Sequence, residues 1–175
     1  EQEGTYNLPE AQLDRFMYKI VVDYPREDDE VEIVRRTTAN REVRLETVLD
    51  RQTILRYQRV VREVLVRDDL YDYAVRLVRA TRVSQDGALP FVREWVAWGA
   101  GPRACQNLIL GAKAHAFFDG RPHITTADIR AVAKPVLRHR VIVSYAAIAE
   151  EITSDRVVET VLETVPAPAD RAARG

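Results

Sequence analysis

The sequence predicts a mainly α-helical protein, a bundle of four or five helices preceded by a short helix and one strand. Three observations lead to this fold class. Apolar residues recur at helical spacing in several stretches, as at Leu70, Ala74 and Leu77. Only residues 18–24 have the pattern of a β-strand. At 175 residues, with 46% apolar and 30% charged side chains, the chain suits one buried core with appendages better than two full domains.

The beginning of the chain predicts a helix and a strand. Residues 9–17 favour a short helix, with Pro9 at its first position and Glu10 in its first turn. Residues 18–24 then favour a strand. A strand needs neighbours for its backbone groups, and no partner is evident downstream. We therefore expect the last strand of a parallel sheet whose other strands lie upstream. Without them the strand should be frayed, packed against the bundle or paired with a second copy.

The rest of the chain predicts helices separated by irregular segments. The helices are indicated by apolar spacing, by acidic first turns and by N-cap residues. Their expected ranges are 27–36, 51–63, 69–82, 103–118, 126–137 and 154–164. Pro135 should kink or shorten the helix that Thr125 caps. The expected irregular segments are 39–50, with an extended piece at 43–45, and 84–102, which is broken by glycines and prolines.

Composition and charge exclude several classes of function. No apolar run approaches the ~18 residues of a membrane span, and no signal peptide is evident. A single cysteine, Cys105, excludes an internal disulfide framework and fits a reducing, cytoplasmic setting. The net charge is −1, and arginines alternate with acidic residues along the predicted helices. Nucleic acid is therefore disfavoured as the main partner, because phosphate binding needs a concentrated cationic surface.

Arg103 is the candidate binding residue that the local pattern singles out. It lies at the start of a predicted helix, directly after residues 99–102 (Gly-Ala-Gly-Pro). A cation at this end opposes the positive pole of the helix, at a cost of ~0.3–1 kcal/mol. A local rule broken without visible compensation points to function, and a helix N-terminus with an arginine suits a phosphate group. The structural alternative is a solvated or salt-bridged arginine.

Other kinds of site find little support in the sequence. The three histidines, His115, His123 and His139, have no metal-ligand spacing among themselves or with Cys105, so no metal site is predicted. No serine lies in a nucleophile-elbow context. The sequence has no glycine-rich phosphate loop with its Lys and Ser/Thr, and no apolar strand that ends in an acidic pair for Mg²⁺. Alone, the chain is expected neither to hydrolyse ATP nor to bind it tightly.

Several separated blocks of the sequence resemble the MoxR family of AAA+ proteins. Residues 1–16, EQEGTYNLPEAQLDRF, are similar to the closing part of the family's ATPase core. Residues 66–82, which end in LVRATR, resemble a helix of its lid, and residues 99–104, GAGPRA, resemble a second lid element usually written GASPRA. Residues 119–140 resemble the family's DGR…VLRHR ending. The blocks occur in the family's order and cover nearly the whole chain to about residue 166.

The resemblance implies a division of the chain. Residues 1–25 would be a helix–strand remnant of the α/β ATPase core, residues 26–166 a helical-bundle AAA+ lid domain, and residues 167–175 a disordered tail. The only methionine is Met17, so no initiator precedes Glu1. The chain is therefore expected to be an excised or processed C-terminal portion of a longer ATPase.

The resemblance also implies two site residues. Arg15 corresponds to the arginine finger, which in this family reaches across a subunit boundary to the γ-phosphate of a neighbour's ATP. By spacing alone, Arg15 is a cation in the last turn of a helix, paired with Asp14. Arg103 corresponds to the sensor 2 arginine, which reaches the ATP of its own subunit. Two departures, Asn7 for proline and Gly101 for serine, should loosen loops without removing either arginine.

The parent ATPase is then expected to use ATP and Mg²⁺, with none bound tightly by this chain alone. It would form a homo-oligomeric, commonly hexameric, ring and couple hydrolysis to chaperone-like remodelling of a client protein. Glu1, Glu3 and Thr5 would line a subunit contact or a pore-side loop. Two rival functions remain open: a non-enzymatic helical adaptor that binds a protein through the region of Trp95 and Trp98, and a nucleic-acid-binding helical domain, against which the net charge weighs.

Overall fold

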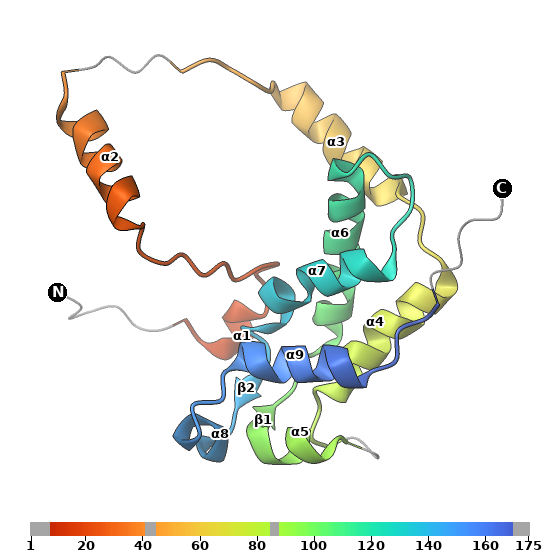
Figure 1. Cartoon of the computed structure of the whole chain (residues 1–175). Helices are drawn as coiled ribbons and strands as arrows, with labels where there is room; N and C mark the ends of the chain where they lie inside the picture. The colour runs from red at the N-terminus through yellow and green to blue at the C-terminus, as the bar shows by residue number, and fades with distance from the viewer. Residues whose placement is uncertain (1–7, 41–44, 85–87, 170–175) are drawn as a thin grey trace.

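The computed structural model describes residues 8–40, 45–84 and 88–169 (Figure 1). Within this part, helices dominate and two short strands form the sheet, so the predicted mainly α-helical class is confirmed. In chain order the elements are α1 (Glu10–Leu13), α2 (Glu27–Thr38), α3 (Arg51–Glu63), α4 (Asp68–Ala80), α5 (Pro90–Trp95), β1 (Val96–Trp98), α6 (Pro102–Phe118), α7 (Thr126–Leu137), β2 (Ile142–Val143), α8 (Tyr145–Ala149) and α9 (Ser154–Thr164).

The core forms where α6 crosses α7. Helix α4 packs against α6, and α9 packs against both α7 and α4. The buried face of α6 carries small residues, including Ala104, Ala112 and Ala116, so the backbones of its neighbours can approach closely. Larger side chains from the surrounding helices fill the remaining space, since a packed interior leaves few voids. The largest fully buried ones are Tyr73, Leu70, Leu77, Leu108, Ile129 and Leu137.

The caps of several helices explain why their ends lie where the sequence placed them. Helix α3 begins after Asp50, whose carboxylate accepts a hydrogen bond from the backbone N–H of Thr53 at 2.7 Å. Helix α7 begins with the predicted capping box of Thr125 and Asp128. Pro135 lies inside α7 and does not interrupt it, since the helix continues for two residues and ends at Leu137.

A small antiparallel sheet closes the lower end of the bundle in Figure 1. Strand β1 pairs with β2 through Val96 and Val143 and through Trp98 and Ile142, with a register irregularity between the two pairs. The expectation of an irregular segment over 84–102 is wrong here, because this segment contains α5 and β1. Pro90 occupies the first position of α5, where a missing N–H costs nothing.

The N-terminal part differs most from the prediction. Helix α1 is one turn long and begins after Pro9 instead of extending over 9–17. Residues 18–24 form no strand; only their beginning is packed against the bundle. Tyr18 is half-buried against the core, and the Lys19 N–H donates to the carbonyl of Pro135 at 2.9 Å. Residues 19–26 are exposed. Among the described residues, no strand pairs with this segment, which explains why it does not form a strand itself.

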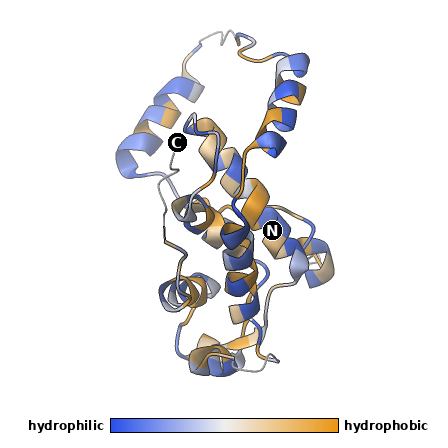
Figure 2. Cartoon of the chain, turned by 90° about the vertical axis from the view of Figure 1, so that its right-hand side faces the viewer, coloured by the Kyte–Doolittle hydropathy of each residue, from blue (hydrophilic) through white to orange (hydrophobic). Residues whose placement is uncertain are grey.

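Helix α2 lies apart from the bundle. It begins where predicted and ends two residues later, at Thr38, yet every one of its residues is exposed, including Val31, Ile33 and Val34 (Figure 1). Figure 2 shows hydrophobic residues on both α2 and the outlying part of α3. The domain boundary that the sequence places between residues 25 and 26 stays a prediction. Residues 43–44 of the expected extended piece, and residues 170–175 of the expected tail, lie outside the described ranges.

No helix in the part of the chain that the structure describes combines the length and the apolar character needed to cross a bilayer.

Candidate functional site

Arg103 lies at the positive end of α6 and is paired with an acid from far away in the sequence. Gly101 is the N-cap and Pro102 the first helical residue, so Arg103 follows at the second position. Its Nη1 donates to Oδ2 of Asp14 at 2.5 Å, and its side chain is 46% exposed. The carboxylate supplies the compensation that the sequence did not reveal. The salt-bridged arginine, which was the structural alternative, is what the structure contains; a phosphate contact stays a prediction.

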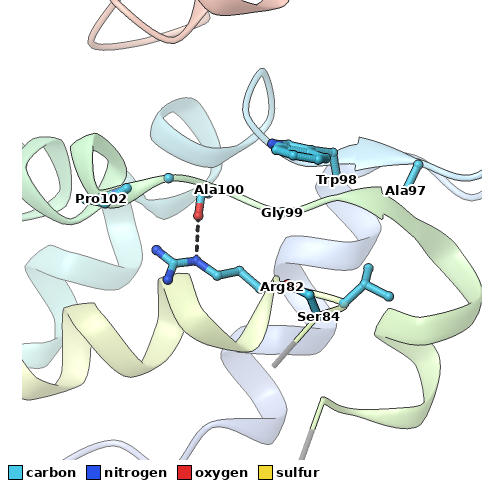
Figure 3. Close-up of a pocket in the computed structure, with 9 residues that line it drawn as sticks. Arg82, Ser84, Ala97, Trp98, Gly99, Ala100 and Pro102 are labelled. Atoms are coloured by element: carbon cyan, nitrogen blue, oxygen red, sulfur yellow. Dashed lines mark hydrogen bonds between the residues drawn. The ribbon is translucent and has the colours of Figure 1, made fainter. Parts of the chain in front are cut away.

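The loop that delivers Arg103 is fixed to the C-terminal end of α4. The backbone N–H of Ala100 donates to the hydroxyl of Thr81 at 2.9 Å, and Thr81 is fully buried. Nε of Arg82 donates to the carbonyl of Ala100 at 2.9 Å (Figure 3). These bonds flank a shallow pocket of about 270 Å³, over which the ring of Trp98 lies. The start of α6 is therefore held in place by side chains of the two residues that follow α4, which bond to the backbone of Ala100.

Gly99 is required in this loop, which gives a stability prediction. A Cβ at position 99 would lie 2.3 Å from the carbonyl oxygen of Thr81, a backbone atom that cannot move aside easily. We expect Gly99→Ala to lower the free energy of unfolding by ~2 kcal/mol, the usual cost of overpacking. Urea unfolding of the two proteins measures this difference. Gly101→Ser is the matched control, because a Cβ there meets nothing within 4 Å and serine is a good N-cap. A Gly99→Ala protein as stable as the control would contradict the prediction.

Arg140 is a buried arginine whose importance the sequence did not reveal. The residue is 4% exposed, and burial lowers the pKa of its guanidinium while the Asp14 carboxylate opposes that shift. Nε donates to Oδ1 of Asp14 at 3.0 Å, and Nη2 donates to the carbonyls of Asp14 at 2.8 Å and Phe16 at 2.6 Å. Nη1 donates to the carbonyl of Met17 at 3.3 Å and to that of Val136. All five N–H groups therefore have acceptors, as a buried guanidinium requires.

The two residues before Arg140 contact the same N-terminal segment. Arg138 forms a two-point ion pair with Asp155, both distances being 2.9 Å, and also donates to the carbonyl of Lys19 at 3.3 Å. Nε2 of His139 lies 3.0 Å from the carbonyl of Phe16 and must donate to it. Burial lowers the pKa of His139, which keeps the ring neutral. The available signal in the sequence was a run of three basic residues between two apolar segments.

Arg15 lies directly after the shared carboxylate of Asp14. Asp14 pairs with Arg103 and Arg140, so the expected pairing of Asp14 with Arg15 is wrong. The Arg15 side chain is exposed, and within the described ranges it has neither a hydrogen bond nor an ion pair. The structure thus places Arg103 in contact with Asp14, the residue that directly precedes Arg15 in the chain. Their predicted roles toward nucleotide stay predictions.

A second polar cluster lies at the other end of α6. His115, Asp119 and Asp128 place ligand-type atoms within 4.8 Å of one another, a grouping that sequence spacing did not indicate. Arg121 occupies the centre, donating to Asp128 at 2.5 and 2.8 Å and to Asp119 at 2.9 Å. Asp128 also accepts from His115 and from the N–H and hydroxyl of Thr125. Its oxygens are therefore already satisfied by the protein, an arrangement that leaves little for a cation.

The remaining candidates from the sequence have structural surroundings. Cys105 is half-buried, and burial raises the pKa of its thiol, which suits a small apolar residue better than a nucleophile. Trp95 packs against Phe91 with ring centroids 5.6 Å apart, whereas Trp98 is 71% exposed. Three residues were expected at a subunit contact or a pore-side loop, and all of them lie outside the described part of the chain: Glu1, Glu3 and Thr5.

Known proteins resemble this chain over nearly its whole length. Residues 91–161 match a family profile described as the AAA lid domain. The chain is 40% identical over 168 residues to Chaperone MoxR1 of Mycobacterium tuberculosis. This alignment covers 96% of the chain and 44% of that protein. It is 31% identical over 174 residues to the uncharacterized protein YeaC of Bacillus subtilis, covering 99% of the chain and 52% of that protein.

A solved structure agrees with these sequence matches. A protein of Cytophaga hutchinsonii assigned as an ATPase superposes with a TM-score of 0.88 at 37% identity, over 97% of this chain and 52% of that one. The chain thus spans about half the length of the relatives it matches.

Proposed function

This chain belongs to the MoxR family of AAA+ proteins, and we propose that it serves as the lid-bearing part of an ATPase in which two of its arginines contact ATP. We call the longer protein, in which this chain is joined to a nucleotide-binding core, the parent ATPase. In this proposal Arg103 binds the nucleotide of its own subunit, and Arg15 reaches the γ-phosphate of a neighbour's nucleotide. The observation that carries the proposal is the ion pair of Arg103 with Asp14, the residue directly before Arg15 in the chain.

The chemistry of Arg103 supports a phosphate contact. Its guanidinium lies at the N-terminus of a 17-residue helix, where backbone N–H groups and the helix dipole favour an anion. Its present partner is a carboxylate, the anion that a phosphate most resembles in its geometry with arginine. The pair is partly solvent-exposed, so a phosphate can replace Asp14 at small cost.

Arg15 supports a contact to a second subunit. Its guanidinium is exposed, whereas the backbone around it is held by the buried Arg140. A finger arginine stabilises the charge that develops on the transferred phosphoryl group. This role requires an ordered backbone and a guanidinium that is free to contact the neighbour.

The residues present fit a phosphate better than they fit Mg²⁺. The carboxylate that contacts Arg103 is that of Asp14, and its two oxygens are engaged by Arg140 and Arg103. Magnesium prefers free carboxylate oxygens and water. In the parent ATPase, ATP with its Mg²⁺ would supply the phosphoryl group, and the metal ligands would come from the nucleotide-binding core. This chain contributes positive charge and positioning.

The assembly follows from a finger that acts between subunits. We propose a homo-oligomeric ring, hexameric in the simplest case, in which residues 1–25 complete the core and residues 26–166 form the lid. Closing of the lid on nucleotide would be transmitted to neighbours and used for chaperone-like remodelling of a client protein in the cytoplasm. The name of the mycobacterial relative, Chaperone MoxR1, supports this role.

Replacing Arg103 tests the proposal. We expect Arg103→Ala in the parent ATPase to raise both the ATP Kd and KM by ~10–100-fold, the value of a charge-assisted hydrogen bond. A fluorescent nucleotide titration and steady-state turnover measure the two constants. Arg79→Ala, which removes an exposed arginine from α4, is the control and should change neither constant.

Unchanged constants in Arg103→Ala would contradict a nucleotide role for this residue. Turnover that is also unchanged when Arg15 is replaced would favour the helical adaptor, with the exposed Trp98 as its first contact to examine.

A further inference from the structure

We infer that Arg140 is a positioning residue for Arg15: its buried guanidinium fixes the backbone on both sides of the finger. The inference rests on the proposed function of Arg15 and adds a residue to it. Arg140 itself touches no nucleotide in this scheme, because it is 4% exposed and all its donors are used within the chain.

The contacts of Arg140 bracket Arg15 along the chain. The carbonyl of Asp14, which precedes the Arg15 peptide group, accepts at 2.8 Å, and the carbonyl of Phe16, which follows it, accepts at 2.6 Å. The carbonyl of Met17 accepts at 3.3 Å. These two carbonyls lie in the peptide units 14–15 and 16–17, on either side of the unit that joins Arg15 to Phe16. Fixing both units restricts the backbone of Arg15, so the position from which its side chain extends is defined.

The energetics indicate more than generic packing. A buried guanidinium is costly to desolvate, and an apolar residue of similar volume would often stabilise a core as well. Here four of the five donors reach residues 14–17 and one reaches Val136 near the end of α7. The charge is thus directed at the segment that carries Arg15, whose one-turn helix α1 has no buried residue of its own to hold it.

The same contacts connect Arg15 with Arg103. Oδ1 of Asp14 accepts from Arg140 at 3.0 Å and Oδ2 accepts from Arg103 at 2.5 Å. When a phosphate group binds Arg103, Asp14 loses its contact with Arg103 and keeps its contact with Arg140. Arg140 therefore holds the finger in place while Arg103 exchanges its anion.

A double-mutant cycle in the parent ATPase tests the inference. We expect Arg140→Lys, which keeps the charge but offers three donors in place of five, to lower kcat ~10²-fold, the cost of a misplacement of about 1 Å, with little change in the KM for ATP. In an Arg15→Ala background the same substitution should change kcat less than twofold, because the group it positions is gone. Ring assembly and thermal unfolding are measured on every variant.

The matched control is Arg130→Lys, in α7, the helix that carries Val136. Arg130 also donates to a carbonyl from another element, that of Leu162 at 2.9 Å, but contacts nothing near Arg15. Its kcat should stay near that of the wild type in both backgrounds.

The outcomes separate the two proposals. If Arg140→Lys lowers kcat by the same factor in the wild-type and Arg15→Ala backgrounds, Arg140 acts through stability alone. That result overturns the inference and leaves Arg15 as the finger. A wild-type kcat in Arg140→Lys, with activity lost in Arg15→Ala, overturns it in the same way. An Arg15→Ala protein with full turnover overturns the proposed function and this inference together. Should Arg140→Lys fail to fold, Asp14→Asn replaces it in the same cycle. We expect Asp14→Asn to lower kcat when Arg15 is present and to change it little in the Arg15→Ala background.

Discussion

Arg15→Ala is expected to reduce ATP turnover by the parent ATPase ~10³-fold or more, the magnitude typical of an arginine finger. ATP affinity should change little, because in the proposed ring the side chain serves the site of a neighbour. In the structure this guanidinium is exposed and forms no ion pair with the described residues, so its removal should cost little stability. Steady-state turnover and nucleotide titration, done where rings form, measure both quantities.

Mixing experiments distinguish action between subunits from action within one. Arg15→Ala subunits retain a complete nucleotide site. Subunits in which the Mg²⁺-binding acidic residue of the core (the Walker B acid) is replaced retain Arg15. Each protein alone should be inactive, and mixed rings should recover part of the turnover. Loss of turnover without recovery on mixing would place Arg15 at the site of its own subunit, and full turnover in the single variant would contradict its assignment as a finger.

Asp128→Asn is expected to lower the free energy of unfolding of this chain by ~3 kcal/mol, the cost of breaking a buried charged pair. Asp128 is 1% exposed and holds Arg121, His115 and the N-cap Thr125 together. Asp119→Asn removes a carboxylate that contacts the same Arg121 but is 53% exposed, so its loss should cost less than ~1 kcal/mol. Urea unfolding at pH 7 gives both values. Equal losses for the two variants would contradict the buried network.

The contribution of Asp128 should depend on pH. Burial alone would raise the pKa of this carboxyl, but the hydrogen bonds from Arg121, Thr125 and His115 outweigh it and hold the pKa well below its ordinary value. A lowered pKa in the folded state gives stability that is complete above the ordinary value of ~3.9 and is lost as the pH falls below it. The difference in the free energy of unfolding between wild type and Asp128→Asn should therefore become smaller when the measurement is repeated near pH ~2.5. A difference that stays constant would show that the carboxylate charge is not involved.

Much of the fold was predictable because the long helices carry their own signals. The ranges of α3 and α9 agree with the prediction, since Asp50 and Thr153 cap them and their apolar residues repeat with helical spacing. The short elements were missed for the opposite reason. Strands β1 and β2 pair Val96 with Val143 across a long stretch of chain, and their few residues carry no pattern without the partner. The expected strand over 18–24 had the right residues but no neighbouring strand.

The site was predictable one residue at a time and not as an arrangement. Arg103 was identifiable because its position at a helix start breaks a local rule. The compensating Asp14 lies 89 residues away, and no local pattern could connect the two. Arg140 was hidden for another reason, since an arginine in a sequence is usually exposed and only the fold shows one that is buried.

The contact between Asp14 and Arg140 joins residues 126 positions apart, which bears on the order of events in folding. Ordering so large a loop costs entropy that only an already assembled core can offset. We therefore expect α6 and α7 to dock before the N-terminal segment attaches to them. A contact that forms after the rate-limiting step slows escape from the native state without speeding entry into it. We therefore expect the contacts of Arg140 to slow unfolding more than they speed folding.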